Sequence, residues 1–502
     1  MASLRPIILQ YPGTYGLNTL EDTRTDEETR FGGIVTNGVV GSDGKLTSRE
    51  DFTLTTGSYS NTIQALYTWR QKNATEVILS AGAGNIYSGT TSLTSRLDYS
   101  SNSTTSNSWQ FAALGSNVMI VQDGLDPYLM HEDFTSVGFS GATFSQPNVV
   151  IAAFGRLWAA DDQTGGRRDV IYWSKLLDGH NWGSGDAGNI DLENAWPNGK
   201  DSITALAASG NRLMVFGRET ILLYTIPASH DPASMSLAPE DIISHLGCVA
   251  RDSVQVTDEG IFFLSDNGIY KIDRLAQTTA LLTRAHISKL VNNDILTDLA
   301  TQTNKTLIRS AYYSKEGWYV ISFPTANVTY CVHTRKPVPD VDGALVITKW
   351  TNDSKPFHAF TVTSDDTWYS GGENGVHTFG GYTPDGASNA YNLIFAPQWL
   401  TYGDDTRLKH AKQMVAVLKA ADGQTGTLEW VKDYKENVVT SQAFTCSTIE
   451  FSEDPGLGYL GVKMGGSFNV VKPTLTFPID GDAVTLHQLQ YYATPGAIRP
   501  IM

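Results

Sequence analysis

The sequence predicts an all-β protein, an irregular β-propeller of about six to seven blades with a smaller C-terminal β-sandwich-like domain. Short apolar runs rich in Val, Ile, Leu, Phe, Tyr and Thr are bounded by Gly, Asn, Asp and Ser, as in strands joined by tight turns. A unit made of a strand, a turn, a second apolar strand and a short strand with an aromatic residue recurs along the chain. Successive copies of its turn are roughly 30 to 60 residues apart, which is close to the length of a propeller blade.

The clearest strand-like runs are Thr75–Ser80, Asn117–Gln122, Asn148–Ala153, Arg212–Phe216, Thr220–Thr225, Gly260–Ser265, Gly317–Phe323 and Met414–Leu418. A short sheet cannot bury both of its faces alone. Radial packing of successive sheets buries both faces and leaves only short edges exposed. A sandwich would need long continuous sheets, so a propeller is the better account of most of the chain.

One segment has helical periodicity, from about Thr283 to Leu299. Its apolar positions fall on one face of a helix and are Ile287, Leu290, Val291, Ile295 and Leu299. This stripe predicts an amphipathic helix packed on its own domain. Contact with a neighbouring subunit is the alternative.

Changes of composition indicate three parts. Residues 1–30 are expected to form an N-terminal arm, because residues 21–30 (EDTRTDEETR) are highly charged. Residues 31–385 are expected to form the propeller. Thr383–Ala390 (TPDGASNA) is rich in turn formers and is predicted to be a linker. Beyond it, residues 386–502 are expected to form the C-terminal β-rich domain.

Charge and composition exclude several classes of protein. The 36 basic and 52 acidic residues give a formal charge of −16, the wrong sign for gripping nucleic acid through its phosphates. No run approaches the roughly 20 apolar residues that span a bilayer, and the first residues lack the pattern of a secretion signal. The cysteines, Cys248, Cys331 and Cys446, are too scattered for a disulfide framework or a metal site, so reduced and buried thiols are expected.

Motifs for chemistry are scarce. GxSxG, GxxxxGK[ST] and HExxH are absent from the sequence, so no catalytic residue, cofactor or metal is assigned. Because some propellers are glycosidases, paired carboxylates are candidates for catalysis, and the sequence has three adjacent pairs: Asp161/Asp162, Asp365/Asp366 and Asp404/Asp405. All three pairs lie in polar segments and are expected to be solvated turns. Arg167 and Arg168 are likewise expected in an exposed turn.

A series of motifs resembles one known family. Residues 154–182 (FGRLWAADDQTGGRRDVIYWSKLLDGHNW) resemble a blade of podophage tail nozzle proteins, also called packaged-DNA stabilisation or tail hub proteins. Residues 201–224 and 247–270 resemble the two blades that follow. Residues 37–49 (NGVVGSDGKLTSR) and 399–409 (WLTYGDDTRLK) resemble the family's lead-in and C-terminal signature. The resemblance therefore spans about residues 30 to 410, and its ordered series is more specific than any single motif.

The resemblance marks eight residues as structural features of the blades: Gly155, Trp158, Trp173, Trp182, Gly210, Gly217, Gly260 and Gly268. Glycines such as Gly155 and Gly210 are expected at turns that need a positive φ or a close backbone approach. The tryptophans are expected to pack between sheets, since each brings a large apolar surface.

The resemblance also implies a function and partners. It implies a virion structural protein, made in the host cytoplasm and located in the virion tail, that retains packaged DNA and forms the exit channel for genome ejection. It implies a homo-hexamer below an adaptor ring, with tail fibres or spikes at its side, a plug or needle protein at its mouth, and transient weak contact with translocating DNA. A carbohydrate-binding or glycan-cleaving propeller of a receptor-binding tail device is the alternative, and a cytoplasmic scaffold propeller is a third.

Overall fold

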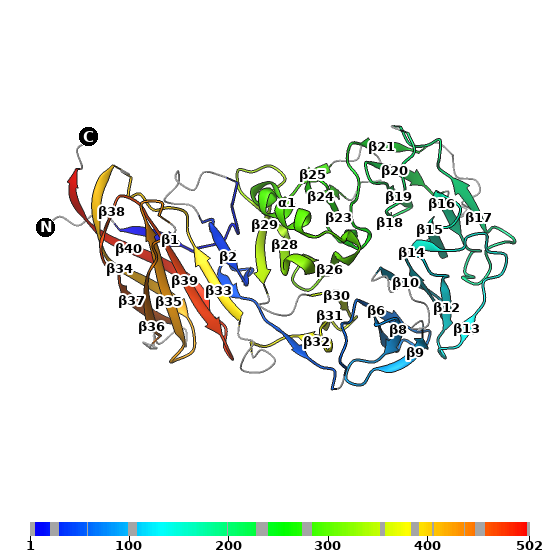
Figure 1. The fold of residues 1–502 in the computed structure, drawn as a ribbon, viewed down its shortest axis with the longest axis horizontal. Coiled ribbons are helices and arrows are strands. Elements are labelled where there is room, and N and C mark those ends of the chain that lie inside the picture. The colour runs from blue at the N-terminus through cyan, green and yellow to red at the C-terminus, as the bar shows by residue number, and fades with distance from the viewer. Residues whose placement is uncertain are drawn as a thin grey trace.

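The computed structural model describes residues 6–20, 30–57, 59–98, 108–197, 199–226, 239–273, 284–351, 357–382, 391–403, 406–435, 437–446 and 457–498. These residues form strands joined by turns, with one α-helix, α1 (Asn292–Thr301). A ring of sheets occupies one end of the molecule and a stack of long strands the other (Figure 1). The all-β prediction is confirmed. In the described part of the chain, no helix has the length and apolar character to cross a membrane.

Six separate four-stranded antiparallel sheets form blades of a propeller within the described residues. They are β6–β9 (Ala65–Arg70, Glu76–Gly82, Asn85–Ser88, Thr94–Asp98), β10–β13 (Trp109–Leu114, Asn117–Gln122, Tyr128–His131, Ser136–Val137), β14–β17 (Pro147–Ala153, Arg156–Asp162, Arg167–Trp173, Gly188–Asp191), β18–β21 (Ala205–Ser209, Arg212–Phe216, Thr220–Thr225, Asp241–Ser244), β22–β25 (Gln255–Val256, Gly260–Ser265, Gly268–Asp273, Arg284–His286), and β30–β32 (Ala359–Val362, Trp368–Gly372, Gly375–Phe379) with β5 (Phe52–Leu54).

The ring is completed by four strands of a larger sheet, β26–β29 (Arg309–Tyr313, Trp318–Phe323, Val328–Pro337, Leu345–Thr351). The innermost strands contact one another in the order β6, β10, β14, β18, β22, β26 and β30, and β30 contacts β6 again. The propeller therefore has six separate blades and one sector that it shares with the second domain, in line with the predicted six to seven.

The last blade is built from both ends of the propeller's chain. β5 supplies its outermost strand and pairs antiparallel with β32, Phe52 opposite Phe379. The Phe52 ring lies 5.0 Å from that of Trp368 in a T-shaped arrangement. Aromatic pairs of this kind stabilise a contact by about 1 kcal/mol beyond the area that they bury, so they help to hold the ring closed.

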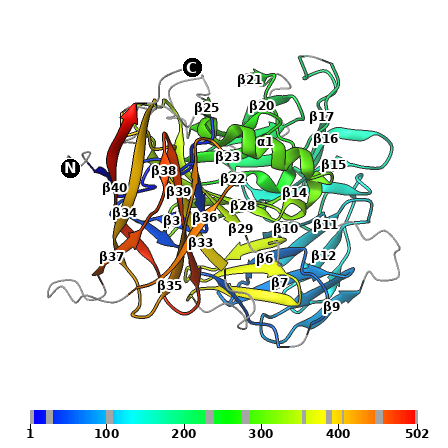
Figure 2. The same cartoon turned by 60° about the vertical axis from the view of Figure 1, so that its left-hand side comes forward.

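The second domain is a sandwich of two sheets. Beyond β29, the nine-stranded sheet continues with β2 (Ile34–Thr36), β33 (Tyr391–Ala396), β39 (Val471–Ile479), β35 (Thr425–Lys432) and β36 (Thr440–Thr445). The seven-stranded sheet has the order β3 (Gly38–Val40), β4 (Leu46–Ser48), β40 (Thr485–Ile498), β34 (Arg407–Lys419) and β37 (Leu457–Lys463), with β1 (Ile7–Gln10) on β40 and β38 (Ser467–Phe468) on β34. Figure 2 shows the two layers, with β40, β34 and β37 in one.

The observed pairing differs from the sequence-based domain boundaries. β1 to β4 pair within the sandwich sheets, so these four strands belong with the C-terminal strands and not with an arm or the propeller. Sequence patterns identify strands but not their partners, which for β1, β2 and β4 include strands more than 300 positions away. Residues 21–29 and the predicted linker 383–390 lie outside the described residues.

The predicted helix begins later than its periodicity suggests. Residues 284–286 are strand β25, paired with β24, and α1 starts only at Asn292 after a 3-10 turn, η3 (Lys289–Val291). Tertiary pairing thus overrides helical periodicity at the N-terminal end of the segment. The predicted apolar stripe is nevertheless buried, with Ile287, Leu290, Val291, Ile295 and Leu299 all in the largest core.

Arg49 joins the two domains. Its guanidinium is fully buried and lies 4.1 Å from the ring centroid of Tyr391 at the start of β33. Its Nη1 donates a hydrogen bond to Asp51, 3.0 Å away and just before β5. Its Nε donates to the side chain of Asn37, 3.1 Å away, whose backbone N–H in turn donates to Lys349 of β29. The same buried guanidinium therefore contacts the sandwich and the residue that precedes β5, the strand that completes the last blade.

Candidate functional site: the axial cavity of the propeller

The inner strands line an open cavity of about 490 Å³ on the propeller axis. Its wall combines polar groups with the apolar side chains of five different blades: Leu66, Phe111, Ile151, Leu206 and Phe360. The ionic groups of the wall are Arg251, Asp252 and Arg309. These three residues are the axial cluster.

Local structure presents the axial cluster to the cavity. Arg251 and Asp252 belong to a 3-10 turn, η2 (Arg251–Ser253), just before β22, and Arg309 begins β26. Ser253 is fully buried and fixes this turn, because its Oγ donates to the carbonyl of Ala250 at 2.6 Å and accepts from the N–H of Leu264 at 3.1 Å.

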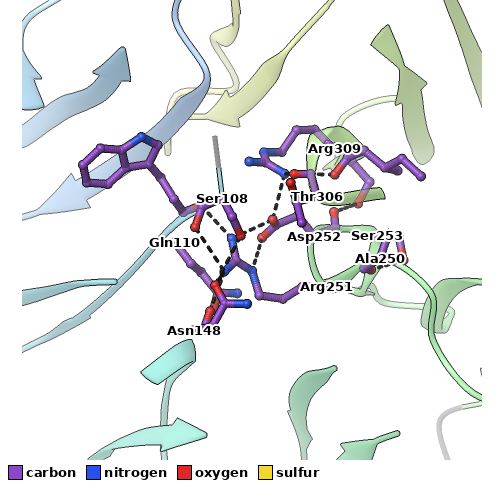
Figure 3. Close-up of polar contacts among 12 residues, drawn as sticks. Ser108, Gln110, Asn148, Ala250, Arg251, Asp252, Ser253, Thr306 and Arg309 are labelled. Carbon is purple, nitrogen blue, oxygen red and sulfur yellow. Dashed lines mark hydrogen bonds and ion pairs between the residues drawn. The ribbon is translucent and has the colours of Figure 1, made fainter. Parts of the chain in front are cut away.

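Arg251 spans the cavity (Figure 3). Its Nη2 donates to the carbonyl oxygen of Trp109 at 2.9 Å, and its Nη1 donates to that of Ser108 at 3.3 Å and to Oδ1 of Asn148 at 2.9 Å. Trp109 and Asn148 lie on β10 and β14, whereas Arg251 precedes β22, and β18 stands between β14 and β22 in the ring. One side chain therefore ties together blades that are not neighbours.

Asp252 is held between two guanidiniums. Its carboxylate accepts from Nε and Nη2 of Arg251 at 3.1 and 2.8 Å, and lies 2.9 Å from Nη1 of Arg309. The side chains are largely buried, with 7% of each arginine and 16% of Asp252 exposed. Burial lowers the pKa of Arg309 from its ordinary value, while the Asp252 carboxylate opposes that change.

This arrangement limits the chemistry of the cavity. Asp252 is the one carboxylate among the described residues that line it. Both of its oxygens face guanidinium groups and are engaged in charge-assisted hydrogen bonds within the protein. The hydrogen bonds of Arg251 are made to the protein itself. The cluster therefore acts as a cross-link between blades.

The carboxylate pairs lie away from this cavity. Asp161 and Asp162 end β15 and are 7% and 1% exposed, so the expectation of a solvated turn is wrong for this pair. Asp161 has a φ of +55° at a break in the register between β15 and β16, and burial raises its pKa. Asp365 and Asp366 lie in an exposed turn between β30 and β31, as predicted, whereas Asp404 and Asp405 lie outside the described residues.

Each buried carboxylate organises a loop. Asp162 accepts hydrogen bonds from the backbone N–H groups of Gln146 at 2.9 Å and Thr164 at 3.2 Å. Asp161 accepts from the side-chain amide of Asn148 at 3.2 Å and faces the guanidinium of Arg168 at 3.4 Å. Asn148 thus links Asp161 to Arg251. Arg167 and Arg168 are exposed, as predicted, but they begin β16.

The three marked tryptophans are buried. Trp158 and Trp173 lie 5.8 Å apart, ring centroid to ring centroid, in the core between the β14–β17 and β18–β21 blades. Trp182 packs against Phe144 on the other side of the same blade, with ring centroids 4.7 Å apart. Each indole N–H donates to a backbone carbonyl, at 3.0, 2.9 and 2.9 Å respectively. None lines the axial cavity.

The marked glycines lie at strand ends. Gly155 and Gly210 occupy turns, with φ values of +71° and +63°, as predicted. Gly217 follows β19, where a Cβ would stand 2.3 Å from the carboxylate of Asp201, and Gly260 begins β23. Gly268 begins β24 with a φ of +122°. These glycines shape the turns and strand ends of the blades.

Sequence reasoning missed the axial cluster. Arg251 and Asp252 are adjacent in an ordinary polar stretch, ARDS, and match no motif. The acceptors of Arg251 are mostly backbone carbonyls more than 100 positions away, which leave no trace in residue types. The strongest available signal was an adjacent basic and acidic residue eight positions ahead of the apolar run Gly260–Ser265, and such a signal is common.

The sequence matches no family model, and it matches no curated protein. Among solved structures, the chain is similar to one in the crystal structure of a mitotic checkpoint complex, at 12% identity and a TM-score of 0.42, covering 66% of this chain and 94% of that one. It is similar to YCF48 from Cyanidioschyzon merolae, at 9% identity and a TM-score of 0.39, covering 66% and 98%. It is also similar to the WD40 β-propeller domain of Doa1, at 9% identity and a TM-score of 0.38, covering 66% and 97%. These similarities concern the fold alone, and the assignment of a propeller rests on the sheet order described above.

Proposed function

We propose that this chain is a structural subunit of the tail nozzle, or tail hub, of a short-tailed phage. In this role it retains packaged DNA and forms part of the channel through which the genome leaves. Its partners are further copies of itself in a hexameric ring, the adaptor ring above, fibres or spikes at the side and a plug or needle at the mouth. The ordered series of blade motifs between residues 37 and 409 is the basis in sequence.

The observation that carries the proposal is the cross-link across the propeller axis. The ionic groups of the axial cavity are bonded to one another and to distant blades, so the propeller is cross-linked through its centre. A channel for DNA is then built between copies of the chain and not through one of them. Rigid cross-linked blades suit a protein that must resist pressure from packaged DNA.

Two further features support the proposal. The nine-stranded sheet runs from the propeller into the sandwich, so a force on one domain passes to the other through strands and not through a loop. Each copy carries a formal charge of −16, and like charges repel DNA, so that a ring of copies would let DNA slide with little adhesion.

Negative-stain imaging of the purified full chain, alone and mixed with the adaptor protein encoded in the same genome, tests the proposal. We expect rings that stack on the adaptor ring. A parallel assay for binding and release of host-surface glycans is expected to give no turnover. Solitary monomers that cleave glycans would contradict the nozzle role and favour the carbohydrate-processing alternative.

A further inference from the structure

Two strands of the sandwich have an open, uncharged edge. Among the residues that the structure describes, β36 (TSQAFT) ends the nine-stranded sheet and pairs only with β35, and β1 (IILQ) pairs only with β40. Neither strand contains a charged residue or a proline. Most side chains of β36 are exposed, and Ile8 of β1 is 44% exposed. Open edges of this kind are templates for pairing with another chain.

The outer strands of the propeller blades are protected in ways that β36 is not. β13 has two residues and β5 has three. β9, β17, β21 and β25 each contain at least one Asp or Arg. Short length and charge are the usual devices that prevent pairing between edges. β36 has six residues and neither device, which indicates that its edge is covered in the assembled protein.

The backbone groups that β36 offers can be assigned from its pairing. Cys446, just after β36, donates its N–H to Gln424 at 2.7 Å and accepts from Gly423 at 2.9 Å, so its polar groups face β35. Residues alternate in an antiparallel pair. The N–H and C=O groups of Ser441 and Ala443 therefore point away from β35, toward the open side.

The same reasoning applies to β1. The N–H of Tyr11 donates to the carbonyl of His487 at 3.0 Å, so Leu9 and Ile7 face β40 by alternation. Ile8 and Gln10 then point their backbone groups outward. Each strand thus has at least two residues whose backbone N–H and C=O groups point to the open side. These groups are enough for a short ladder of hydrogen bonds with a partner strand.

The two open edges lie on opposite margins of the sandwich. β1 flanks β40 on the side away from β34. β37 flanks β34 at the other end of that sheet, and β37 contacts β36. A ring of identical copies needs two different surfaces on opposite sides of each subunit, because its contacts run head to tail. The pair β36 and β1 meets this requirement.

We propose that β36 of one copy pairs with β1 of the next, so that the sandwich sheets are joined around the ring. The inference rests on the proposed function, since it identifies the contact that builds the ring. Val438 and Val439, which precede β36 and are 60% and 51% exposed, lie beside this junction together with Ile8. Their exposure in a single chain is the state before assembly.

Two single variants of the full chain test the pairing. Ala443→Pro removes an outward N–H of β36 and leaves the bonds to β35, since proline is tolerated on edge strands in this orientation. Ile8→Lys places a charge on β1. We expect each variant to lose the ring in sedimentation velocity and native mass spectrometry, both alone and with the adaptor, whereas the wild-type chain forms it.

Mixing the two variants gives the sharper result. The mixture contains one intact β36 and one intact β1, so we expect dimers and no larger species. If Ile8→Lys alone forms dimers, β36 pairs with itself and the proposal is wrong. Thr94→Lys on β9 is the matched control, because it adds the same charge to an exposed blade edge and should leave the ring intact. Ser441→Lys replaces Ala443→Pro if the proline variant melts at a lower temperature.

The outcomes separate this inference from the proposed function. Rings that persist in both variants overturn the β36–β1 contact and leave the nozzle role standing. A wild-type chain that stays monomeric at every concentration, alone and with the adaptor, overturns both.

Discussion

The guanidinium of Arg251 donates a hydrogen bond to the backbone carbonyl of Trp109 at 2.9 Å, across 142 positions of sequence and across the propeller axis. Neighbouring blades pack against one another through apolar cores, whereas this contact joins blades that are not adjacent in the ring. It resists the relative motion of opposite sides of the ring. The stiffness of the propeller therefore depends on a few polar groups at its centre.

Replacing Arg251 with methionine tests this dependence. The change removes a buried charge and leaves the carbonyls of Ser108 and Trp109 with fewer donors, so we expect the free energy of unfolding to fall by about 3 kcal/mol. Urea denaturation followed by tryptophan fluorescence measures it. Arg218→Met is the control, because Arg218 forms an exposed ion pair with Asp266, and its loss should cost less than about 1 kcal/mol. Equal losses would show that Arg251 is not a cross-link.

Two glycines separate backbone strain from crowding. In Gly210→Ala the added Cβ would meet no atom within 4 Å, but the residue would still need a φ of +63°. We therefore expect the free energy of unfolding to fall by about 1 kcal/mol from backbone strain alone. Gly268→Ala has a φ of +122°, and its Cβ would stand 2.1 Å from Oδ1 of Asn292 and 2.8 Å from Oγ of Ser288. The second variant should lose at least twice as much stability in the same urea assay. Similar losses would mean that the start of α1 moves freely.

His333 makes the protein sensitive to acid. Its imidazole is 2% exposed, and burial, followed by the charge of Lys336, lowers its pKa to about 3. In the unfolded chain a histidine takes up its proton near pH 6.5. The unfolded state therefore binds more protons below that pH, and stability falls as the pH drops from 6.5 toward 3.

We expect His333 to cost about 2 kcal/mol at pH 5 relative to pH 7.5. In His333→Phe, which keeps a ring of similar shape, the difference in unfolding free energy between these two pH values should shrink by that amount. His358 remains in the variant, and burial lowers its pKa to about 4, so part of the acid sensitivity should persist. Identical pH profiles for the two proteins would contradict the assignment.

The three thiols are expected to be inert in the native protein. Cys248, Cys331 and Cys446 are free and buried, as the sequence predicts, and burial raises the pKa of Cys248 and of Cys446 to about 11. A thiol reagent should label fewer than one thiol per native chain at pH 8 and all three in denaturant. Rapid labelling of the native protein would show that the sandwich opens near Cys446.

The strands of the propeller were accessible from sequence because their signal is local. Gly260–Ser265 and Thr220–Thr225 were predicted with the bounds that the structure has, since apolar residues between turn formers define each end. The helix was less accurate, because its first residues pair with β24. Neighbouring residues in sequence determine the bounds of these strands, whereas pairing with β24 determines where the helix begins.

Long-range partners were not accessible. The pairing of Ile34–Thr36 with β33 and β29 places an N-terminal strand in the sandwich, and no pattern in those three residues identifies its partners. The same holds for Arg251, whose role depends on carbonyl groups that every residue has. For Asp161 and Asp162, polar neighbours suggested solvent, yet backbone N–H groups and Asn148 surround them.

The position of β5 has a consequence for the order of folding during synthesis. β5 ends at Leu54, but its partner β32 ends only at Phe379, so the ring cannot close until more than three hundred further residues have left the ribosome. Until then, the blades already synthesised cannot form a closed ring, because β5 has no partner strand. Ring closure is a late event of translation, and a nascent chain cut short before β32 retains an open array of blades.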